Sequence, residues 1–129
     1  MRVRAAIKLL VVGPASNFSS LFERLKERGF HFESVQDTGA ARTYLLGQSA
    51  DVALLCLLPE QPDYRTALAW LRGVKGELPV VVISSEADMR PYLAAMESGA
   101  FDYLTTLTPL AEIERVLASA ARWRHRAVA

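Results

Sequence analysis

The chain has 129 residues, which is the size of one domain and enough to bury a stable core. Apolar residues make up 51% of the chain and charged residues 22%, a globular composition that excludes a disordered scaffold. The 15 basic and 14 acidic side chains leave a formal net charge of +1, so no overall field attracts nucleic acid or anionic lipid.

Cysteine usage and the first residues bear on the cellular compartment. Cys56 is the single cysteine, so no intramolecular disulfide can form. Arg2, Arg4 and Lys8 interrupt the first apolar segment, which argues against a signal peptide. No apolar run reaches the roughly 20 residues needed to cross a bilayer. We therefore expect a cytoplasmic protein with no membrane partner.

The chain begins with alternating strand and helix patterns. Residues 7–12 form an apolar run that predicts a strand covered on both faces. Apolar residues at helical spacing from Phe18 to Leu25 predict a helix, which Gly29 ends. Residues 30–35 are a weaker strand candidate.

The pattern continues through the middle of the chain. Thr38 is the predicted N-cap of a second helix, which Gly47 ends. Residues 52–58 form a third, wholly apolar strand, and Asp51 opens it as a solvated residue. A third helix covers residues 64–74.

The last third contains two further strands and two helices. Residues 80–83 and 103–105 predict strands, and the helix between them ends at Gly99. Thr108 followed by Pro109 predicts the N-cap and first residue of a final helix. The apolar stripe of that helix consists of Ile113, Val116, Leu117 and Ala120.

Five strands alternating with five helices predict right-handed crossovers and an open parallel sheet with helices on both faces. The expected fold class is α/β, a flavodoxin-like (βα)5 doubly wound sheet with strand order 2-1-3-4-5. We expect one domain over residues 1–129, with a core at about 7–122 and a basic tail or the start of a linker at 123–129.

Chemistry in such a sheet collects beyond the carboxyl ends of the strands, near the switch in strand order. The residues expected there are Gly13, Pro14, Cys56, Ser84, Ser85, Thr105, Thr106 and Leu107. Magnesium requires hard oxygen ligands, and phosphoryl transfer requires stabilising charge. Because these strand ends supply neither, we expect no catalytic residue, no metal and no cofactor.

Four stretches then resemble one family in order and spacing. They are IKLLVV at 7–12, ADVALLCLLP at 50–59, LPVVVISS at 78–85 and ESGAFDYLTTLTP at 97–109. The sequence resembles the receiver (CheY-like) domain of bacterial two-component response regulators. The last stretch is similar to a segment seen often in receivers of sigma-54-dependent transcription regulators. The resemblance implies a role in phosphorelay signal transduction.

The resemblance also implies where the family site would fall. Gly13 and Pro14 stand at the acidic pair that binds magnesium, and Cys56 stands at the phosphoacceptor aspartate. Thr106 stands at the family lysine, whereas Ser84 and Tyr103 keep the hydroxyl and the aromatic of the switch. The chain is therefore interpreted as a degenerate receiver, or pseudo-receiver, that is not an enzyme.

Such a domain is expected to act by phosphorylation-independent contacts with a protein partner or a covalently linked output domain, in transcription regulation. The family face made by helix 4, strand 5 and helix 5 implies a homodimer, and nothing indicates direct binding of nucleic acid. The candidate residues on this face are Arg90, Glu97, Asp102, Glu112 and Arg115.

Two alternatives remain open. The emptied pocket and Cys56 are compatible with a small-molecule or redox sensor, although a lone cysteine on an apolar strand usually packs as a small hydrophobe. Acidic residues after strands 3 and 4 are compatible with a displaced cation site. They are Glu60, Asp63, Glu86 and Asp88.

Overall fold

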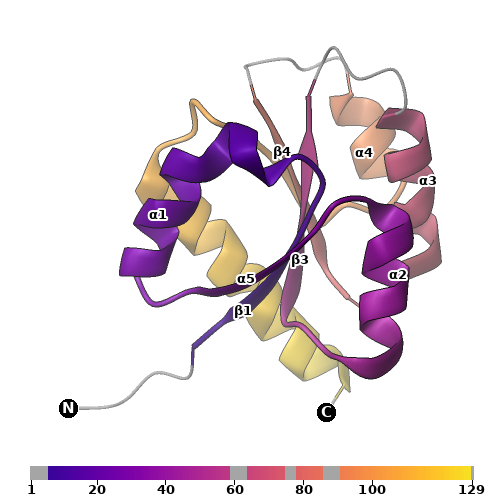
Figure 1. The fold of residues 1–129 in the computed structure, drawn as a ribbon, viewed down its shortest axis with the longest axis horizontal. Coiled ribbons are helices and arrows are strands. Elements are labelled where there is room, and N and C mark those ends of the chain that lie inside the picture. The colour runs from indigo at the N-terminus through magenta and orange to yellow at the C-terminus, as the bar shows by residue number, and fades with distance from the viewer. Residues whose placement is uncertain (1–5, 59–63, 75–77, 86–90, 129) are drawn as a thin grey trace.

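A computed structural model describes residues 6–58, 64–74, 78–85 and 91–128. Five parallel strands form one sheet in the order β2-β1-β3-β4-β5, as the alternation of elements predicted (Figure 1). Their bounds are β1 Lys8–Val12, β2 His31–Val35, β3 Val52–Leu57, β4 Val80–Ser84 and β5 Asp102–Thr105.

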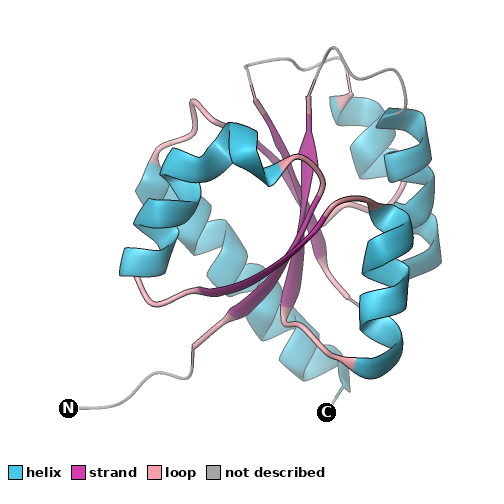
Figure 2. Cartoon of the chain, in the orientation of Figure 1, coloured by secondary structure: helices cyan, strands magenta, loops and turns pink. Residues whose placement is uncertain are grey.

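Helices cover both faces of the sheet, with α1 and α5 on one side and α2, α3 and α4 on the other (Figures 1 and 2). The helices are α1 Ser19–Glu27, α2 Thr38–Gly47, α3 Tyr64–Val74, α4 Tyr92–Glu97 and α5 Leu110–Val128. A short 3-10 helix, η1 Ala15–Phe18, precedes α1. In the part of the chain that is described, no helix is long and apolar enough to cross a membrane.

The sheet separates two hydrophobic cores because alternate side chains of each strand point to opposite faces. In β3, Val52, Leu54 and Cys56 face α1 and α5, whereas Ala53 and Leu55 face α2 and α3. All six residues of β3 are buried, which explains why its sequence is a continuous apolar run. β2 lies at an edge of the sheet and is the most exposed strand.

Three local predictions were wrong. Asp37, not Thr38, caps α2, because the Asp37 carboxylate accepts a hydrogen bond of 2.8 Å from the Ala40 N–H. The Thr108 hydroxyl accepts a hydrogen bond from the Thr105 N–H at 3.1 Å and so holds the turn between β5 and α5. The N-cap of α5 is Pro109 rather than Thr108, because the Pro109 carbonyl accepts the first hydrogen bond of the helix, from the Ile113 N–H at 3.1 Å.

Asp51 is the third correction. Its carboxylate accepts a hydrogen bond from the Lys8 backbone N–H at 2.8 Å, so it ties the start of β1 to the start of β3. Asp51 is half-buried rather than simply solvated. This bond lies at the opposite end of the sheet from the predicted site.

Candidate functional site

The carboxyl ends of β1, β3, β4 and β5 meet at one edge of the sheet. Val12 lies beside Leu55 in the strand register, and Leu57 lies beside Ser84. The fold therefore brings the predicted strand-end positions to this edge: Gly13, Pro14, Cys56, Ser84 and Thr106.

Gly13 turns the chain away from β1 in close contact with β3. Its φ angle is +110°, and a Cβ atom built there would lie 2.8 Å from the carbonyl oxygen of Cys56. Its N–H donates to the Val35 carbonyl at 3.0 Å. Both the backbone conformation and the lack of space require glycine at this position.

Cys56 belongs to the hydrophobic core on the side of α1 and α5. The residue is 2% exposed, and burial raises the pKa of its thiol well above the ordinary value. Among the described residues, no cation offsets this effect of burial. The thiol is therefore protonated near neutral pH, which makes it a poor nucleophile and a poor metal ligand.

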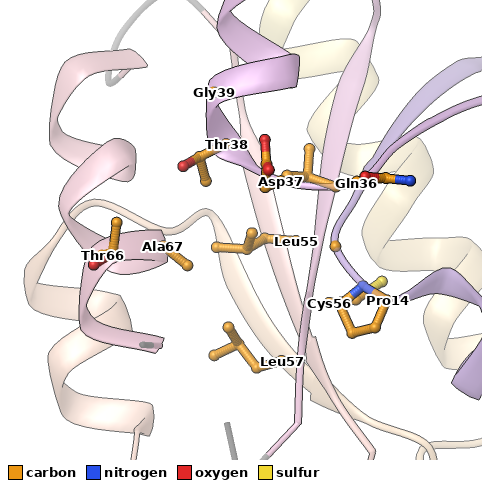
Figure 3. A pocket seen from close by; sticks show the side chains of 12 residues that line it. Pro14, Gln36, Asp37, Thr38, Gly39, Leu55, Cys56, Leu57, Thr66 and Ala67 are labelled. Atoms are coloured by element: carbon orange, nitrogen blue, oxygen red, sulfur yellow. The ribbon is translucent and has the colours of Figure 1, made fainter. Parts of the chain in front are cut away.

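A cleft of 310 Å³ opens between the β1–η1 turn, the end of β3 and the starts of α2 and α3 (Figure 3). Pro14 and Cys56 lie on one side of it, Thr66 and Ala67 of α3 lie on the other, and Gly13 is also among its lining residues. Asp37 is the carboxylate among its lining residues, and one of its oxygens is used as the N-cap of α2. Among the described residues, no group of three or more His, Cys, Asp or Glu is placed to hold a metal ion.

Gln36, Asp37 and Thr66 also line this cleft, although the sequence did not predict them as site residues. Asp37 carried a signal, because it follows a predicted strand and precedes a predicted helix. Thr66 carried none, because its approach to the β3 end depends on how α3 packs. The acidic residues considered for a displaced cation site, at 60, 63, 86 and 88, lie outside the described residues.

Ser84 and Tyr103 lie on neighbouring buried strands. Ser84 is 1% exposed, and its hydroxyl has no hydrogen-bond partner among the described residues. Tyr103 is 7% exposed and meets the Tyr92 ring edge-on, with centroids 5.7 Å apart and an interplanar angle of 85°. Tyr103 is thus a packing residue of the core on the α2, α3 and α4 side.

Thr106 is a neutral residue at the end of β5, where the family resemblance implies a lysine. Its hydroxyl donates to the Ser85 carbonyl at 2.5 Å, and its N–H donates to the Ser84 carbonyl at 3.0 Å. These bonds link the ends of β4 and β5. Thr106 therefore fixes the loop after β5 to the end of β4, and it places no positive charge there.

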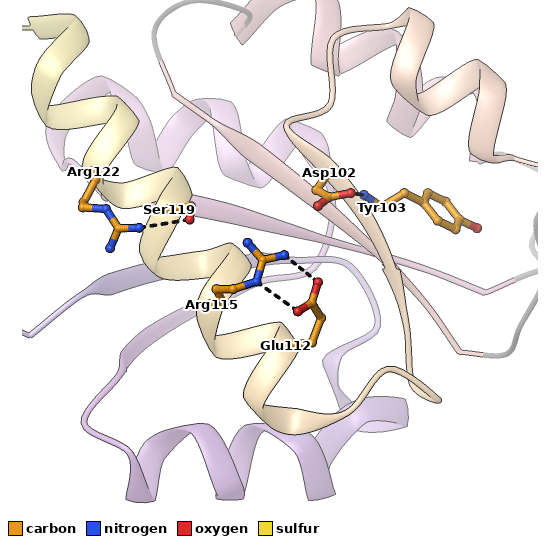
Figure 4. A network of polar contacts seen from close by, with 6 residues as sticks. All are labelled: Asp102, Tyr103, Glu112, Arg115, Ser119 and Arg122. Atoms are coloured by element: carbon orange, nitrogen blue, oxygen red, sulfur yellow. Dashed lines mark hydrogen bonds and ion pairs between the residues drawn. The ribbon is translucent and has the colours of Figure 1, made fainter.

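Three of the five residues of the predicted interaction face lie close together: Asp102, Glu112 and Arg115. Arg115 donates to both carboxylate oxygens of Glu112, at 3.0 and 2.6 Å (Figure 4). This bond lowers the pKa of Glu112 and raises the pKa of Arg115. The negative charge of Asp102 raises the pKa of Arg115 further. Glu97 instead lines a groove with α3, and Arg90 lies outside the described residues.

No family model matches the sequence, and no curated protein matches it. Solved structures match the fold. The structure of FixJ-N has a TM-score of 0.76 at 21% sequence identity, with 92% of this chain and 96% of that chain covered. The receiver domain of the sensor histidine kinase PA1611 from Pseudomonas aeruginosa PAO1 has a TM-score of 0.71 at 22% identity, with 92% and 99% covered.

A longer protein also contains this fold. NtrX from Brucella abortus, crystallised with ADP, matches with a TM-score of 0.71 at 22% identity. The match covers 94% of this chain but only 28% of the NtrX chain. Together with the strand order, these likenesses establish that the chain has the CheY-like, flavodoxin-like fold of response-regulator receiver domains.

Proposed function

We propose that the chain is a receiver-like signalling domain that works without aspartyl phosphorylation, through contacts with a protein partner or a linked output domain. The observation that carries the proposal is the close approach of Gly13 to β3. A side chain at Gly13 would meet the Cys56 carbonyl at 2.8 Å, so this turn has no room for a metal-binding carboxylate.

Three chemical requirements of aspartyl phosphorylation support the same conclusion. Magnesium prefers carboxylate oxygens, which Gly13 and Pro14 do not offer. The thiol of Cys56 is buried and protonated, so it is a poor phosphoacceptor. Thr106 is neutral and cannot stabilise a developing phosphoryl charge as a lysine would. By contrast, the PA1611 receiver holds a magnesium ion in its active-site cleft.

A linked output domain is supported by the comparison with NtrX, in which the receiver fold is one part of a longer chain. We extend the proposal to transcription regulation on the resemblance of residues 97–109 to receivers of such regulators. We also propose that residues 1–129 form one domain, because both cores share a single sheet. The proposal assigns this domain no catalytic activity.

The test is the intact mass of the purified protein after incubation with acetyl phosphate and MgCl2. We expect an unchanged mass, because the strand-end positions Gly13, Pro14 and Cys56 offer no carboxylate as acceptor or metal ligand. A phosphoryl adduct would overturn the proposal. The Cys56→Ala variant, treated in parallel, shows whether the thiol carries any such adduct.

The redox alternative is not favoured. A sensing thiol requires exposure and a lowered pKa, whereas Cys56 is 2% exposed and burial raises its pKa. A small-molecule role for the domain would therefore have to depend on a cleft rather than on the thiol.

A further inference from the structure

A second cleft lies between α1 and the loop that joins β5 to α5, the orange segment beside the violet α1 in Figure 1. Its volume is 340 Å³, which falls within the ~300–1,000 Å³ typical of small-molecule sites. Gly13, Pro14 and Cys56 do not line it. Ser85 and Thr106, at the ends of β4 and β5, do line it, so it adjoins the site described above but shares no lining residue with the 310 Å³ cleft.

The polar side chains that line this cleft are neutral or positively charged. Arg24 is its charged side chain, and no carboxylate stands among the described residues that line it. The other polar side chains carry hydroxyl or amide groups: Asn17, Ser19, Ser20, Ser85, Thr106 and Thr108. Such a set favours an anion, because it supplies donors and a positive charge without a competing carboxylate.

Two of these groups have hydrogen-bond donors to spare. Arg24 is exposed and makes no ion pair or hydrogen bond with the described part of the chain, whereas Arg28 on the same helix pairs with Glu114 at 3.2 Å. The Thr108 hydroxyl accepts from Thr105 N–H at 3.1 Å, which leaves its own proton for another acceptor. Both therefore remain able to donate to a ligand.

Apolar side chains also line the cleft. Phe18 and Ile113, each 2% exposed, belong to the hydrophobic core, and the half-buried Leu21 and Leu110 pack against that core. This arrangement suits a ligand with an apolar body next to its charged group, since burying the body removes apolar surface from water.

We propose that this cleft binds a small organic oxyanion, held at its charged end by Arg24 and Thr108 and at its apolar end by Leu21 and Leu110. A carboxylate and a phosphate monoester share this chemistry. Gly13, Pro14 and Cys56 do not line this cleft, and Thr106 is the one position of the family site that does. A phosphoryl adduct in the mass measurement would overturn the proposed function without deciding whether this cleft binds an anion.

The test is a nitrogen-15 NMR titration at constant ionic strength, with phenyl phosphate in one arm and benzoate in the other. We expect saturable shifts at the amides of Ser19, Ser20 and Thr106 with at least one anion, and the tighter binder identifies the class of charged group. Absence of saturable shifts with both anions would overturn the proposal.

Two variants and a third ligand sharpen the result. Arg24→Gln should weaken binding about tenfold, since a charge-assisted bond is lost. Arg72→Gln, an exposed arginine on α3, should leave binding unchanged. Equal affinity in the Arg24 variant would contradict the site. Inorganic phosphate should bind more weakly than phenyl phosphate, and equal affinity would contradict the role of the apolar side chains.

Discussion

Among single residues, Gly13 and Cys56 determine how the carboxyl edge of the sheet closes. Gly13 brings the backbone after β1 against the Cys56 carbonyl, and the Cys56 side chain belongs to the hydrophobic core on the side of α1 and α5. The edge thus consists of backbone and apolar atoms at the point where the family resemblance implies carboxylates. Each residue supports a separate prediction.

Replacing Gly13 with Ala should lower the free energy of unfolding by at least about 2 kcal/mol, because a positive φ and a close contact act together. Gly29→Ala is a control for strain alone, since its φ is +95° and no atom lies within 4 Å of the added Cβ. It should cost about 1 kcal/mol. Gly47→Ala has open space and an ordinary φ, and should be neutral or stabilising. Urea unfolding measures all three, and equal losses at Gly13 and Gly29 would refute the contact.

The Cys56 thiol should make stability depend on pH in the alkaline range. In the unfolded chain this thiol ionises near pH ~8.5, whereas burial keeps it protonated in the folded protein because its folded pKa is raised. The folded state then binds more protons than the unfolded state above that pH. Stability should fall by about 1.4 kcal/mol per pH unit, and the contribution is fully present below pH ~8.5.

The Cys56→Ala variant isolates this effect from the titration of other groups. Its free energy of unfolding should change less steeply above pH ~8.5 than that of the natural protein. The measurement is urea unfolding of both proteins at several pH values. Parallel curves would mean that the folded thiol ionises as readily as the unfolded one.

Among the elements, α2 shows how a local sequence pattern becomes ambiguous. Asp37 and Thr38 are both good N-cap residues, and the choice depends on how the chain leaves β2. Asp37 has an extended backbone, with φ −155° and ψ 179°, and Thr38 is already helical. Asp37→Ala should therefore cost about 1 kcal/mol of stability.

Thr38→Ala is the matched control, because this residue is the cap that the sequence pattern predicts. It should cost no more than a few tenths of a kcal/mol. Thermal and urea unfolding, followed by circular dichroism, compare the two variants. A larger loss at Thr38 than at Asp37 would reverse the assignment of the cap.

The alternation of elements was predictable where the pattern is periodic and long. The wholly apolar run in β3 and the stripe of α5 each identify an element without tertiary information. The connection rules predicted right-handed crossovers, and the order 2-1-3-4-5 was chosen as the flavodoxin-like arrangement of a doubly wound sheet. The two clefts did not follow, because Asn17 and Thr106 become neighbours only when α1 packs beside the end of β5. Likewise, the pairing of Arg115 with Glu112 depends on rotamers that a sequence does not specify.

For the whole molecule, the homodimer that the family resemblance implies can be tested through the face of α4, β5 and α5. Arg115 already pairs with Glu112 in its own helix, and the charge of Asp102 acts on it. Replacing Asp102 and Arg115 with Ala should raise the dimer dissociation constant about tenfold if these charges pair across a twofold axis. Light scattering after gel filtration measures the mass.

The control for this measurement is Arg42→Ala, an exposed residue of α2, which packs against β1 and β2 rather than β5. It should leave the mass unchanged. If the double variant and the natural protein have the same mass at every concentration, this face does not hold two copies together.

Because the protein's single thiol is buried, its rate of modification can report how often the native structure opens. Cys56 lies on the central strand β3 and is 2% exposed, so a thiol reagent reaches it only when the sheet separates from α1 and α5. Every modified molecule has therefore opened at least once. The rate of modification under native conditions reports the population and lifetime of the open form, with no introduced probe.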